Sequence, residues 1–516
     1  MTAPPVGGRP GAPHTTLLAG DAADERLLAQ VHPAGWRNPT PAPRYHLVVV
    51  GAGTGGLVTA AAAAGLGARV ALVERSLMGG DCLNVGCVPS KSVIRAARAW
   101  QDARAAAERF GGPRAEGDGD FAAVMERLRG VRAGLAPVDG APRFRGLGVD
   151  VFLGDARFVG PDAVEVDGAR LAFRRAVIAA GARAAVPDVP GLRDSAYYTN
   201  ETIFSLARRP AHLVVLGAGP IGCELAQAFA RLGARVTLLD RGTRVLDRDD
   251  AEAAAIVERA LTRDGVAVVH GAELTRVDAR GAESTLHVRQ GGRERTFDTD
   301  ALLVAVGRAP NVDGLGLEAA GVRYDARRGV AVDDRLRTSN RRVYAVGDVC
   351  SALKFTHAAD FQARLVVQNA LFFGRGRASA LVTPWVTYTS PEVAQVGLTR
   401  ETAATARVAV DEVTVPFAEV DRAVIDDETE GFCRVLLARG SGRIVGATLV
   451  GAHAGETIGE VTLAMTNRLG LGAIGRTMHP YPTQSEALRK AADAWARRKL
   501  TPRVQGLFAG YFRVVR

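Results

Sequence analysis

The chain has 516 residues, of which 47% are apolar and 23% are charged. At roughly 150 residues per domain, this length suggests about three domains, and the composition is that of a globular protein rather than a disordered one. No apolar run reaches the roughly 18 residues that a membrane-spanning helix needs. The N-terminus also lacks the basic and apolar regions of a secretory signal. We therefore expect a cytoplasmic protein without a membrane partner.

The formal net charge is +10, which raises the question of nucleic-acid binding. The basic residues are spread along the chain, and net charge by itself speaks to nonspecific association rather than to fold. We therefore expect no nucleic-acid partner. Of the 65 basic residues only four are lysines, namely Lys91, Lys354, Lys490 and Lys499. A lysine in so arginine-rich a chain marks a position where arginine does not serve.

The chain contains five cysteines, which are Cys82, Cys87, Cys223, Cys350 and Cys433. A low, odd number in a long chain argues against the disulfide framework of a secreted protein. It leaves room for one close pair with a redox function.

In chain order, residues 1–44 come first and are rich in Pro, Gly and Ala. We expect an extension with a short helix over residues 24–31. At Tyr45 the pattern changes to a buried strand over 47–50, a Gly-rich turn and an Ala-rich helix. A second strand over 69–73 completes a β-α-β unit.

The same unit returns further along the chain. Residues 51–75 and 217–241 align without a gap and are identical at 14 of 25 positions. In such turns the first glycine permits a tight turn, the second lets the backbone approach a pyrophosphate, and the third lets helix pack on strand. An acid at the end of the second strand binds a ribose hydroxyl. The residues expected at the first turn are Gly51, Gly53, Gly56 and Glu74, and those at the second are Gly217, Gly219, Gly222 and Asp240.

Directly after the first unit, Cys82 and Cys87 are separated by four residues at the start of an expected helix. Such a pair can close a small disulfide ring, and a helix N-terminus lowers the pKa of a thiol. The neighbouring cysteine pair assigns the first turn to FAD and leaves the second to a nicotinamide cofactor.

The pattern changes again in the last third of the chain. Strands are expected over 301–306 and 343–346, followed from about residue 380 by strands near 385–396 and 432–450 and a helix near 455–469. This last stretch carries no dinucleotide motif, so we expect a separate C-terminal domain.

These motifs, in this order, resemble the pyridine nucleotide–disulfide oxidoreductases, or flavoprotein disulfide reductases. The resemblance covers about residues 45–500. It implies an α/β fold with two doubly wound Rossmann-type domains and a C-terminal α+β dimerisation domain. The implied divisions are an extension at 1–44, an FAD domain at 45–195, an NAD(P) domain at 196–310, a central domain at 311–380 and a dimer-interface domain at 381–516.

The resemblance also implies roles for individual residues. Cys87 faces the flavin as a thiolate, Cys82 meets the substrate, and Lys91 pairs with Glu224 near the flavin. Further residues implied for FAD are Lys91, Ala156, Gly181, Asp348 and Ala358, and those implied for NAD(P)H are Arg241 and Gly307. No resident metal site is expected.

The chain departs from the family at the C-terminal acid–base site. Thiol-handling members carry a histidine five residues before a glutamate, but here Tyr481 stands five residues before Glu486. A phenol is a poor general base at neutral pH. His479 lies two residues away and is an alternative base. A second departure is Asp81 before Cys82, where the family has threonine.

Tyrosine at this position is typical of the mercuric reductase branch, yet no cysteine follows Cys433. No tyrosine lies within 101–150 to match the branch's second active-site tyrosine. We expect a mercuric-reductase-like enzyme that passes electrons from NAD(P)H through FAD and the dithiol to a thiophilic metal ion such as Hg(II). The alternatives are dihydrolipoyl dehydrogenase-like turnover with His479, or a non-enzymatic flavin redox sensor. A homodimer is expected, and Asp240 favours NADH over NADPH.

Overall fold

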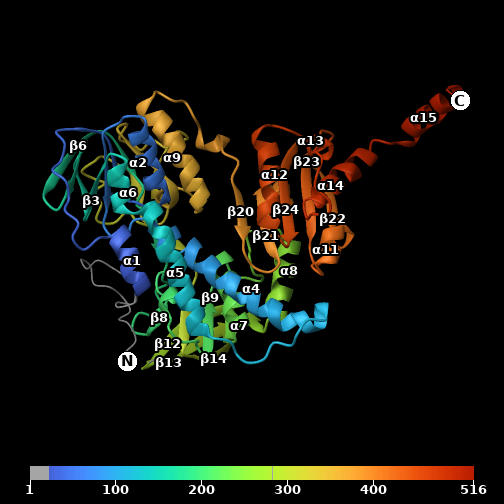
Figure 1. Cartoon of the computed structure of the whole chain (residues 1–516), viewed down its shortest axis with the longest axis horizontal. Helices are drawn as coiled ribbons and strands as arrows, with labels where there is room; N and C mark the ends of the chain where they lie inside the picture. Colours follow the sequence, from blue (N-terminus) through green and yellow to red (C-terminus); the bar gives the residue numbers. More distant parts are fainter. Residues whose placement is uncertain (1–21, 282, 516) are drawn as a thin grey trace. The chain divides into compact units, whose positions relative to one another are not determined.

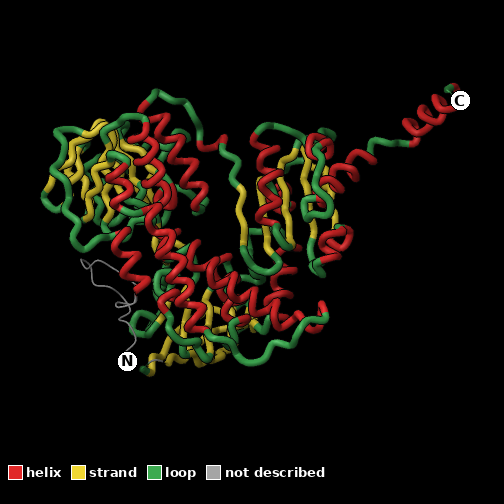
Figure 2. Tube along the Cα trace, in the orientation of Figure 1, coloured by secondary structure: helices red, strands yellow, loops and turns green. Residues whose placement is uncertain are grey.

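The computed structural model describes residues 22–281 and 283–515, which form two compact units (Figures 1 and 2). Within these ranges, the first unit comprises residues up to 104, 114–241 and 269–381. The second comprises 105–113, 242–268 and 382 onward. None of the helices in the described residues has the length and apolarity to cross a bilayer.

The first sheet of the first unit has seven strands. Its order is β3-β2-β1-β6-β5-β4, with β19 beside β6, and it is parallel from β3 to β6 and at β19. The strands are β1 Tyr45–Val50, β2 Val70–Glu74, β3 Val149–Leu153, β4 Ala156–Gly160, β5 Ala163–Val166, β6 Ala169–Ile178 and β19 Val343–Ala345. The central strands β1 and β2 are almost fully buried, which accounts for their runs of Val, Leu and Ala, and β6 is buried at its C-terminal end.

The helices of this part include a short one before the first strand. They are α1 Ala22–Val31, α2 Thr54–Gly65, α3 Gly80–Asn84, α4 Cys87–Phe110, α5 Phe121–Asp139, α6 Ala141–Gly146 and α9 Thr356–Leu371. The helix expected over 24–31 is confirmed as α1. It buries Leu27 and Val31 in the core and is tied to α5 by an ion pair between Asp24 and Arg132 at 2.7 Å.

The second parallel sheet of this unit contains β10-β9-β15-β8. The elements are β8 Tyr197–Tyr198, β9 His212–Leu216, α7 Pro220–Arg231, β10 Arg235–Leu239 and β15 Ala301–Val304. A separate three-stranded antiparallel sheet precedes β15 in the sequence. It is formed by β12 Ala272–Arg280, β13 Glu283–Gln290 and β14 Arg293–Thr299. Two short pairs complete the unit: β7 Ala182–Ala184 with β16 Arg308–Pro310, and β17 Tyr324–Asp325 with β18 Gly329–Val330.

The second unit is built on one antiparallel sheet of order β20-β21-β24-β23-β22. The strands are β20 Pro384–Thr387, β21 Glu392–Gly397, β22 Val410–Pro416, β23 Phe432–Ala438 and β24 Ile444–Gly451. Strand β11 Val266–Val269 is instead the edge strand of the sheet that contains β10 and β9. The helices are α8 Ala251–Arg263, α10 Arg400–Thr405, α11 Asp421–Ile425, α12 Ala454–Thr466, α13 Leu471–Arg476, α14 Glu486–Arg497 and α15 Pro502–Val514. Arg434 is buried at the sheet and is neutralised by Asp250 at 2.7 Å.

The expected architecture is confirmed: an α/β chain with two doubly wound parallel sheets and an α+β C-terminal part. Each Gly-rich turn lies between a buried strand and a helix, β1 to α2 and β9 to α7. Element ends differ by a few residues from the expected ones. The strand expected over 301–306, for example, ends as β15 at Val304.

We expect Gly222→Ala to destabilise the protein, because a Cβ at this position would lie 1.9 Å from the Gly217 carbonyl oxygen. To relieve this clash, helix α7 must shift away from the Gly-rich turn, which lowers the free energy of unfolding by about 1–3 kcal/mol. Gly219→Ala is the matched control: its Cβ would meet nothing within 4 Å, and its φ of −74° suits alanine. The control should change the unfolding free energy by less than about 0.5 kcal/mol. Urea unfolding followed by circular dichroism compares them, and equal losses would contradict the packing argument.

Candidate active site

Both Gly-rich turns depend on a glycine at their first position. Gly51 and Gly217 have φ values of 102° and 107°, a region that side chains other than glycine rarely adopt. A Cβ on Gly51 would lie 2.4 Å from the Ala179 carbonyl oxygen, and one on Gly217 would lie 2.7 Å from that of Ala305. Each turn therefore lies directly against the end of the neighbouring parallel strand.

An acidic residue fixes each turn in the same way. The Ala52 amide donates to a Glu74 carboxylate oxygen at 2.7 Å, and the Ala218 amide donates to Asp240 at 2.7 Å. The acid that the sequence assigns to a ribose thus also holds the second residue of its turn. The two repeated segments of the sequence therefore also repeat the same hydrogen bond between a turn amide and an acidic side chain.

The second glycine of each turn leaves room for a phosphate. Gly219 has no neighbour that a Cβ would approach within 4 Å, and the nearest to Gly53 is the Gly80 Cα at 3.7 Å. Both glycines are the N-cap residues of their helices, α2 and α7. Free amide groups at a helix N-terminus bind phosphate. Both turns therefore fit the pyrophosphate of a dinucleotide.

A further acid of the expected FAD site lies between two cationic side chains. Asp348 is in the short helix η2 Gly347–Val349, and Arg308 Nε lies 3.3 Å from its carboxylate. Burial raises the pKa of Asp348, and the charges of Arg308 and Lys354 oppose that shift. Arg308 also forms an ion pair with Asp81, the residue that departs from the family before Cys82. Asp81 is therefore a charge-compensated partner of this cluster.

The structure places the remaining expected cofactor residues as follows. Gly181 and Gly307 are at chain reversals with φ values of 68° and 134°. Ala358 is buried in the first turn of α9, and Ala156 begins β4. Arg241 is exposed directly after Asp240.

The cysteine pair is positioned by a short helix followed by a sharp turn. Cys82 lies in α3, and Cys87 is the first residue of α4. Gly86 allows the close return, since a Cβ there would lie 2.8 Å from the Asp81 carbonyl oxygen. Both thiols are free, and Cys87 Sγ shares a hydrogen bond with Thr356 Oγ1 at 3.4 Å.

This arrangement separates the pKa values of the two thiols. The hydrogen bond from Cys82 lowers the pKa of Cys87 to about 6, and Thr356 and Lys91 act in the same direction against partial burial and Glu224. Cys82 donates that hydrogen bond, so its own pKa is raised, and burial adds to the shift. At neutral pH the reduced pair therefore holds one thiolate, on Cys87, and one thiol, on Cys82.

The expected pair of Lys91 and Glu224 lies beside the thiols. Lys91 Nζ is 2.9 Å from a Glu224 oxygen, and Glu224 is buried in α7. Both charges act on Cys87, Lys91 lowering its pKa and Glu224 raising it. A compact ammonium serves such a point contact better than a planar guanidinium.

Asp139, which the sequence analysis did not single out, also faces the pair. A Cβ on Gly79 would lie 3.2 Å from an Asp139 carboxylate oxygen, and the Asp139 charge raises the pKa of Cys82. Burial raises the pKa of Asp139 itself, while Arg143 opposes this. Asp139 ends α5, far from Cys82 in sequence, so no local motif marks it.

The C-terminal site residues lie in the second unit. Tyr481 is exposed, and its hydroxyl donates to Asp421 at 2.8 Å, which raises its pKa. Glu486 is buried at the start of α14 and accepts from Arg489 at 2.8 Å. The His479 side chain is only 6% exposed, and its Nε2 lies 2.8 Å from Glu460.

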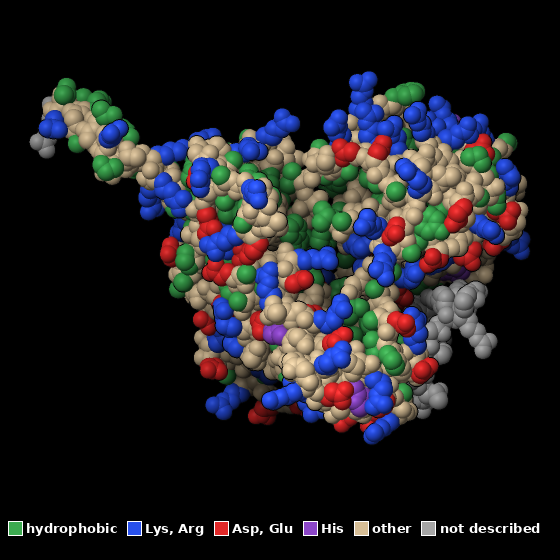
Figure 3. Space-filling view, turned by 180° about the vertical axis from the view of Figure 1, so that it is seen from behind, with side chains coloured by type: hydrophobic (Ala, Val, Ile, Leu, Met, Phe, Trp, Pro, Cys, Tyr) green, Lys and Arg blue, Asp and Glu red, His purple; other side chains and the backbone are tan. Residues whose placement is uncertain are grey.

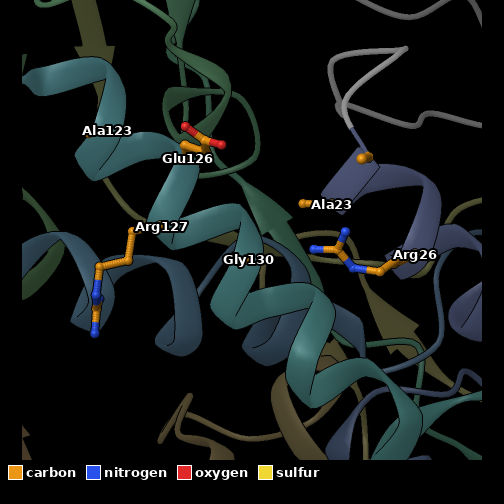
Figure 4. Close-up of a pocket in the computed structure, with 7 residues that line it drawn as sticks. Ala23, Arg26, Ala123, Glu126, Arg127 and Gly130 are labelled. Atoms are coloured by element: carbon orange, nitrogen blue, oxygen red, sulfur yellow. The ribbon is translucent and has the colours of Figure 1, made fainter.

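A hollow of about 560 Å³ lies elsewhere in the first unit, between α1 and α5 (Figure 4). Its lining residues are Ala22, Ala23, Arg26, Ala123, Glu126, Arg127 and Gly130. These differ from the expected site residues and bring no nucleophile together with a base.

The chain contains the dinucleotide-binding fold twice, and two thiols with separated pKa values lie beside the first Gly-rich turn. These features together define a class of protein, the nucleotide-dependent thiol oxidoreductases. Comparison with protein families identifies the particular one. Residues 45–363 match the model described as pyridine nucleotide-disulphide oxidoreductase, and 383–492 match that family's dimerisation domain. The chain therefore belongs to the pyridine nucleotide-disulphide oxidoreductase family, whose members use a flavin and a pyridine nucleotide.

The chain is similar to two kinds of characterised enzyme. It is 36% identical to the mercuric reductase of Streptomyces lividans over 87% of this chain and 96% of that one. It is 35% identical to the dihydrolipoyl dehydrogenase of Thermus scotoductus over 87% of this chain and 97% of that one. Among solved structures, the flavoprotein disulfide reductase RclA of Escherichia coli as a Cu(II) complex superimposes with a TM-score of 0.77 at 27% identity, over 88% and 100%.

We expect iodoacetamide to alkylate Cys87 of the reduced protein with a midpoint at about pH 6. Because this pKa is lowered, the thiolate persists above about pH 6 and is lost as the pH falls through it. Thr356→Val removes a hydrogen bond to the thiolate and should raise the midpoint by roughly 0.5–1 unit. Thr356→Ser keeps the hydroxyl and should keep the midpoint. Mass spectrometry of the labelled peptide measures both, and an unmoved midpoint in Thr356→Val contradicts the assignment.

We expect Asp139→Asn to speed alkylation of Cys82 in the reduced protein at pH 8 by roughly three- to tenfold. Removing the negative charge lowers the pKa of the Cys82 thiol and so increases its thiolate fraction. Glu126→Gln, at an exposed acid on the same helix, is the matched control and should leave the rate unchanged. Equal rates in all three proteins would show that Asp139 does not act on Cys82.

Proposed function

We propose that this protein is an FAD-dependent NAD(P)H oxidoreductase that uses the Cys82–Cys87 pair to reduce a thiophilic metal ion, with Hg(II) as the first candidate. The observation that carries the proposal is the C-terminal site. There Tyr481 occupies the position of the family's base, and the nearby histidine is buried against Glu460. The similarity to mercuric reductases supports it.

Both nucleotide turns fit their cofactors, as their glycines and acids indicate. Gly51, Gly53, Gly56, Glu74 and Asp348 would hold FAD. When bound, FAD supplies a route for an electron pair from the nicotinamide to the disulfide. The chain contributes the charges around that route: the amide groups at the start of α9 favour negative charge nearby, and Lys91, which is partly exposed, is a cation balanced by the buried Glu224.

The two cysteines have different roles in the proposed reaction. Cys87 is held as the thiolate by Thr356, Lys91 and the hydrogen bond from Cys82. Cys82 keeps its proton until a substrate competes for its sulfur. A metal that binds thiolates displaces that proton directly, whereas attack on a disulfide requires a base to take it and an acid to return it.

The C-terminal residues favour the metal over the disulfide. The pKa of the Tyr481 phenol is raised by its hydrogen bond to Asp421, so it stays protonated at neutral pH. His479 bonds Glu460 at one ring nitrogen and the Thr477 carbonyl at the other, at 2.8 and 2.9 Å. With both nitrogens engaged, His479 serves the packing of its own unit better than acid–base chemistry.

The first unit offers a further argument. Residues 101–150 contain no tyrosine to stand beside the thiols, and the carboxylate of Asp139 lies there instead. A thiolate with a nearby carboxylate suits metals of intermediate softness as well as Hg(II). Cu(II), with which RclA was crystallised, is therefore the second metal to test.

Dihydrolipoyl dehydrogenase-like turnover is the second candidate function. The similarity to dihydrolipoyl dehydrogenases favours it, at 35% identity against 36% for the mercuric reductase. A purely sensory flavoprotein is a third and has less support, because the lowered pKa of Cys87 and the Lys91–Glu224 pair serve electron transfer.

We also propose that the protein is a homodimer. Residues 383–492 match the family's dimerisation domain. In the proposed assembly, Tyr481 and Glu486 of one subunit complete the site around Cys82 of its two-fold partner. An active monomer in solution would exclude it.

We expect the wild-type protein to oxidise NAD(P)H faster with a mercuric–thiolate complex than with lipoamide. Tyr481→His supplies the missing base and should raise lipoamide turnover by at least roughly tenfold, the low end of general acid–base assistance. Tyr481→Phe supplies no base and should not. Steady-state rates with mercuric–thiolate, lipoamide and glutathione disulfide are the measurement.

Fast lipoamide turnover by the wild-type protein would argue against the proposed metal reduction. Lipoamide turnover at ordinary dehydrogenase rates in the wild type, unaffected by Tyr481→His and abolished by His479→Gln, would make His479 the base. The proposed metal reduction would then be wrong, and the dihydrolipoyl dehydrogenase-like function would replace it.

We expect a higher kcat/KM for NADH than for NADPH, because the Asp240 carboxylate binds a ribose hydroxyl and repels a 2′-phosphate. Asp240→Asn removes that repulsion and should improve NADPH relative to NADH by about tenfold. Arg241→Gln removes the neighbouring cation and should lower kcat/KM for NADPH without changing kcat/KM for NADH. A strong preference of the wild type for NADPH in stopped-flow reduction would overturn the assignment.

A further inference from the structure

The last helix of the chain, α15, is not packed against the rest of its unit. None of its 13 residues is buried, and Figure 1 shows no other helix or strand beside it. Thr501 caps its N-terminus by accepting from the Val504 amide, and Pro502 stands in the first turn. The helix thus has its own start signals. A helix of this length is marginal in water without a surface to pack on.

One side of α15 is apolar. At about 3.6 residues per turn, its large apolar side chains fall on a single side. They are between 52% and 84% exposed: Leu507, Phe508, Tyr511, Phe512, Val514 and Val515. The opposite side carries only small or polar residues, among them Gly506, Ala509 and Arg513. Figure 3 shows hydrophobic and basic side chains along this projecting end. The pattern is that of an amphipathic helix with an uncovered apolar face.

The charge around α15 is of one sign. Residues 494–516 contain six basic side chains and no Asp or Glu. The basic residues are spread along the chain, but in this segment no acidic side chain accompanies them. Three of them, Arg497, Arg498 and Lys499, immediately precede the helix.

We infer that α15 binds an anionic lipid surface, lying in the plane of the interface with its apolar face inserted. A basic polar side opposite a face of Phe, Tyr and Leu is the composition of such helices. The charge decides against the main alternative occupant, a second copy of α15, because two such helices would bring like charges together without a compensating acid.

This inference goes beyond the proposed function and is compatible with the lack of a spanning helix in the described residues. A helix of 13 residues is too short to cross a bilayer and long enough to lie on one. The lack of an apolar run long enough to span a bilayer does not bear on contact with its surface.

The test is flotation of the full-length, FAD-loaded protein with vesicles of phosphatidylcholine containing 30 mol % phosphatidylglycerol, against phosphatidylcholine alone. We expect binding to the anionic vesicles only. Leu507→Asp/Phe508→Asp places two acids on the apolar face and should lower the bound fraction by at least roughly tenfold. Gly506→Asp/Ala509→Asp makes the same charge change on the opposite side and should lower it by less than about threefold.

Flavin absorbance and circular dichroism verify that each variant is folded, and light scattering measures its oligomeric state. Failure of the wild type to bind anionic vesicles, or equal loss in both variants, would overturn the inference. So would a change of oligomeric state confined to Leu507→Asp/Phe508→Asp without an effect on vesicle binding, which would assign the face to a second copy. Metal or lipoamide turnover is unaffected by any of these outcomes, so they leave the proposed function to its own test.

Discussion

The chemistry proposed for this protein depends on the difference between the pKa values of two neighbouring thiols, Cys82 and Cys87. Because Cys82 donates its hydrogen bond to Cys87, the two thiols cannot titrate independently, and the first proton to leave comes from Cys87 at about pH 6. The surrounding elements serve this asymmetry. The turn at Gly86 brings the sulfurs together, the first residue of α9 bonds the thiolate, and Lys91 compensates its charge. Cys82, the sulfur proposed to meet the substrate, is thereby kept protonated, so in this proposal the group that removes its proton decides which substrate reacts.

The parts of this site that follow from the sequence are those made by short, regular segments. The two Gly-rich turns, their acids and the cysteine spacing each lie within about 40 residues and are read by local rules. The structure gives both acids the same contact, from Glu74 to the Ala52 amide and from Asp240 to the Ala218 amide. The order of parallel strands follows as well, since buried strands of a doubly wound sheet appear as continuous apolar runs.

The parts that did not follow are contacts between residues far apart in sequence. The charge of Asp139, at the end of α5, acts on the pKa of Cys82, and nothing in its own segment differs from an ordinary helix end. The pairing of Asp81 with Arg308 joins positions 227 residues apart. It explains physically how an acid is accommodated where the family has threonine. His479 could be identified as an alternative base from spacing, but its burial against Glu460 depends on how α12 packs in the second unit.

The titratable groups named in the proposal, each described within its own unit, also bear on the proposed substrate choice. A disulfide substrate needs a group that takes a proton at neutral pH and returns it. The Tyr481 phenol has a raised pKa, both His479 nitrogens are bonded, and the interaction with Cys87 together with burial raises the pKa of Cys82. A metal ion bypasses all three, because its own charge lowers the pKa of the sulfur it binds. This arrangement is therefore the physical basis for proposing metal ligation, a reaction that needs no further acid or base from the chain.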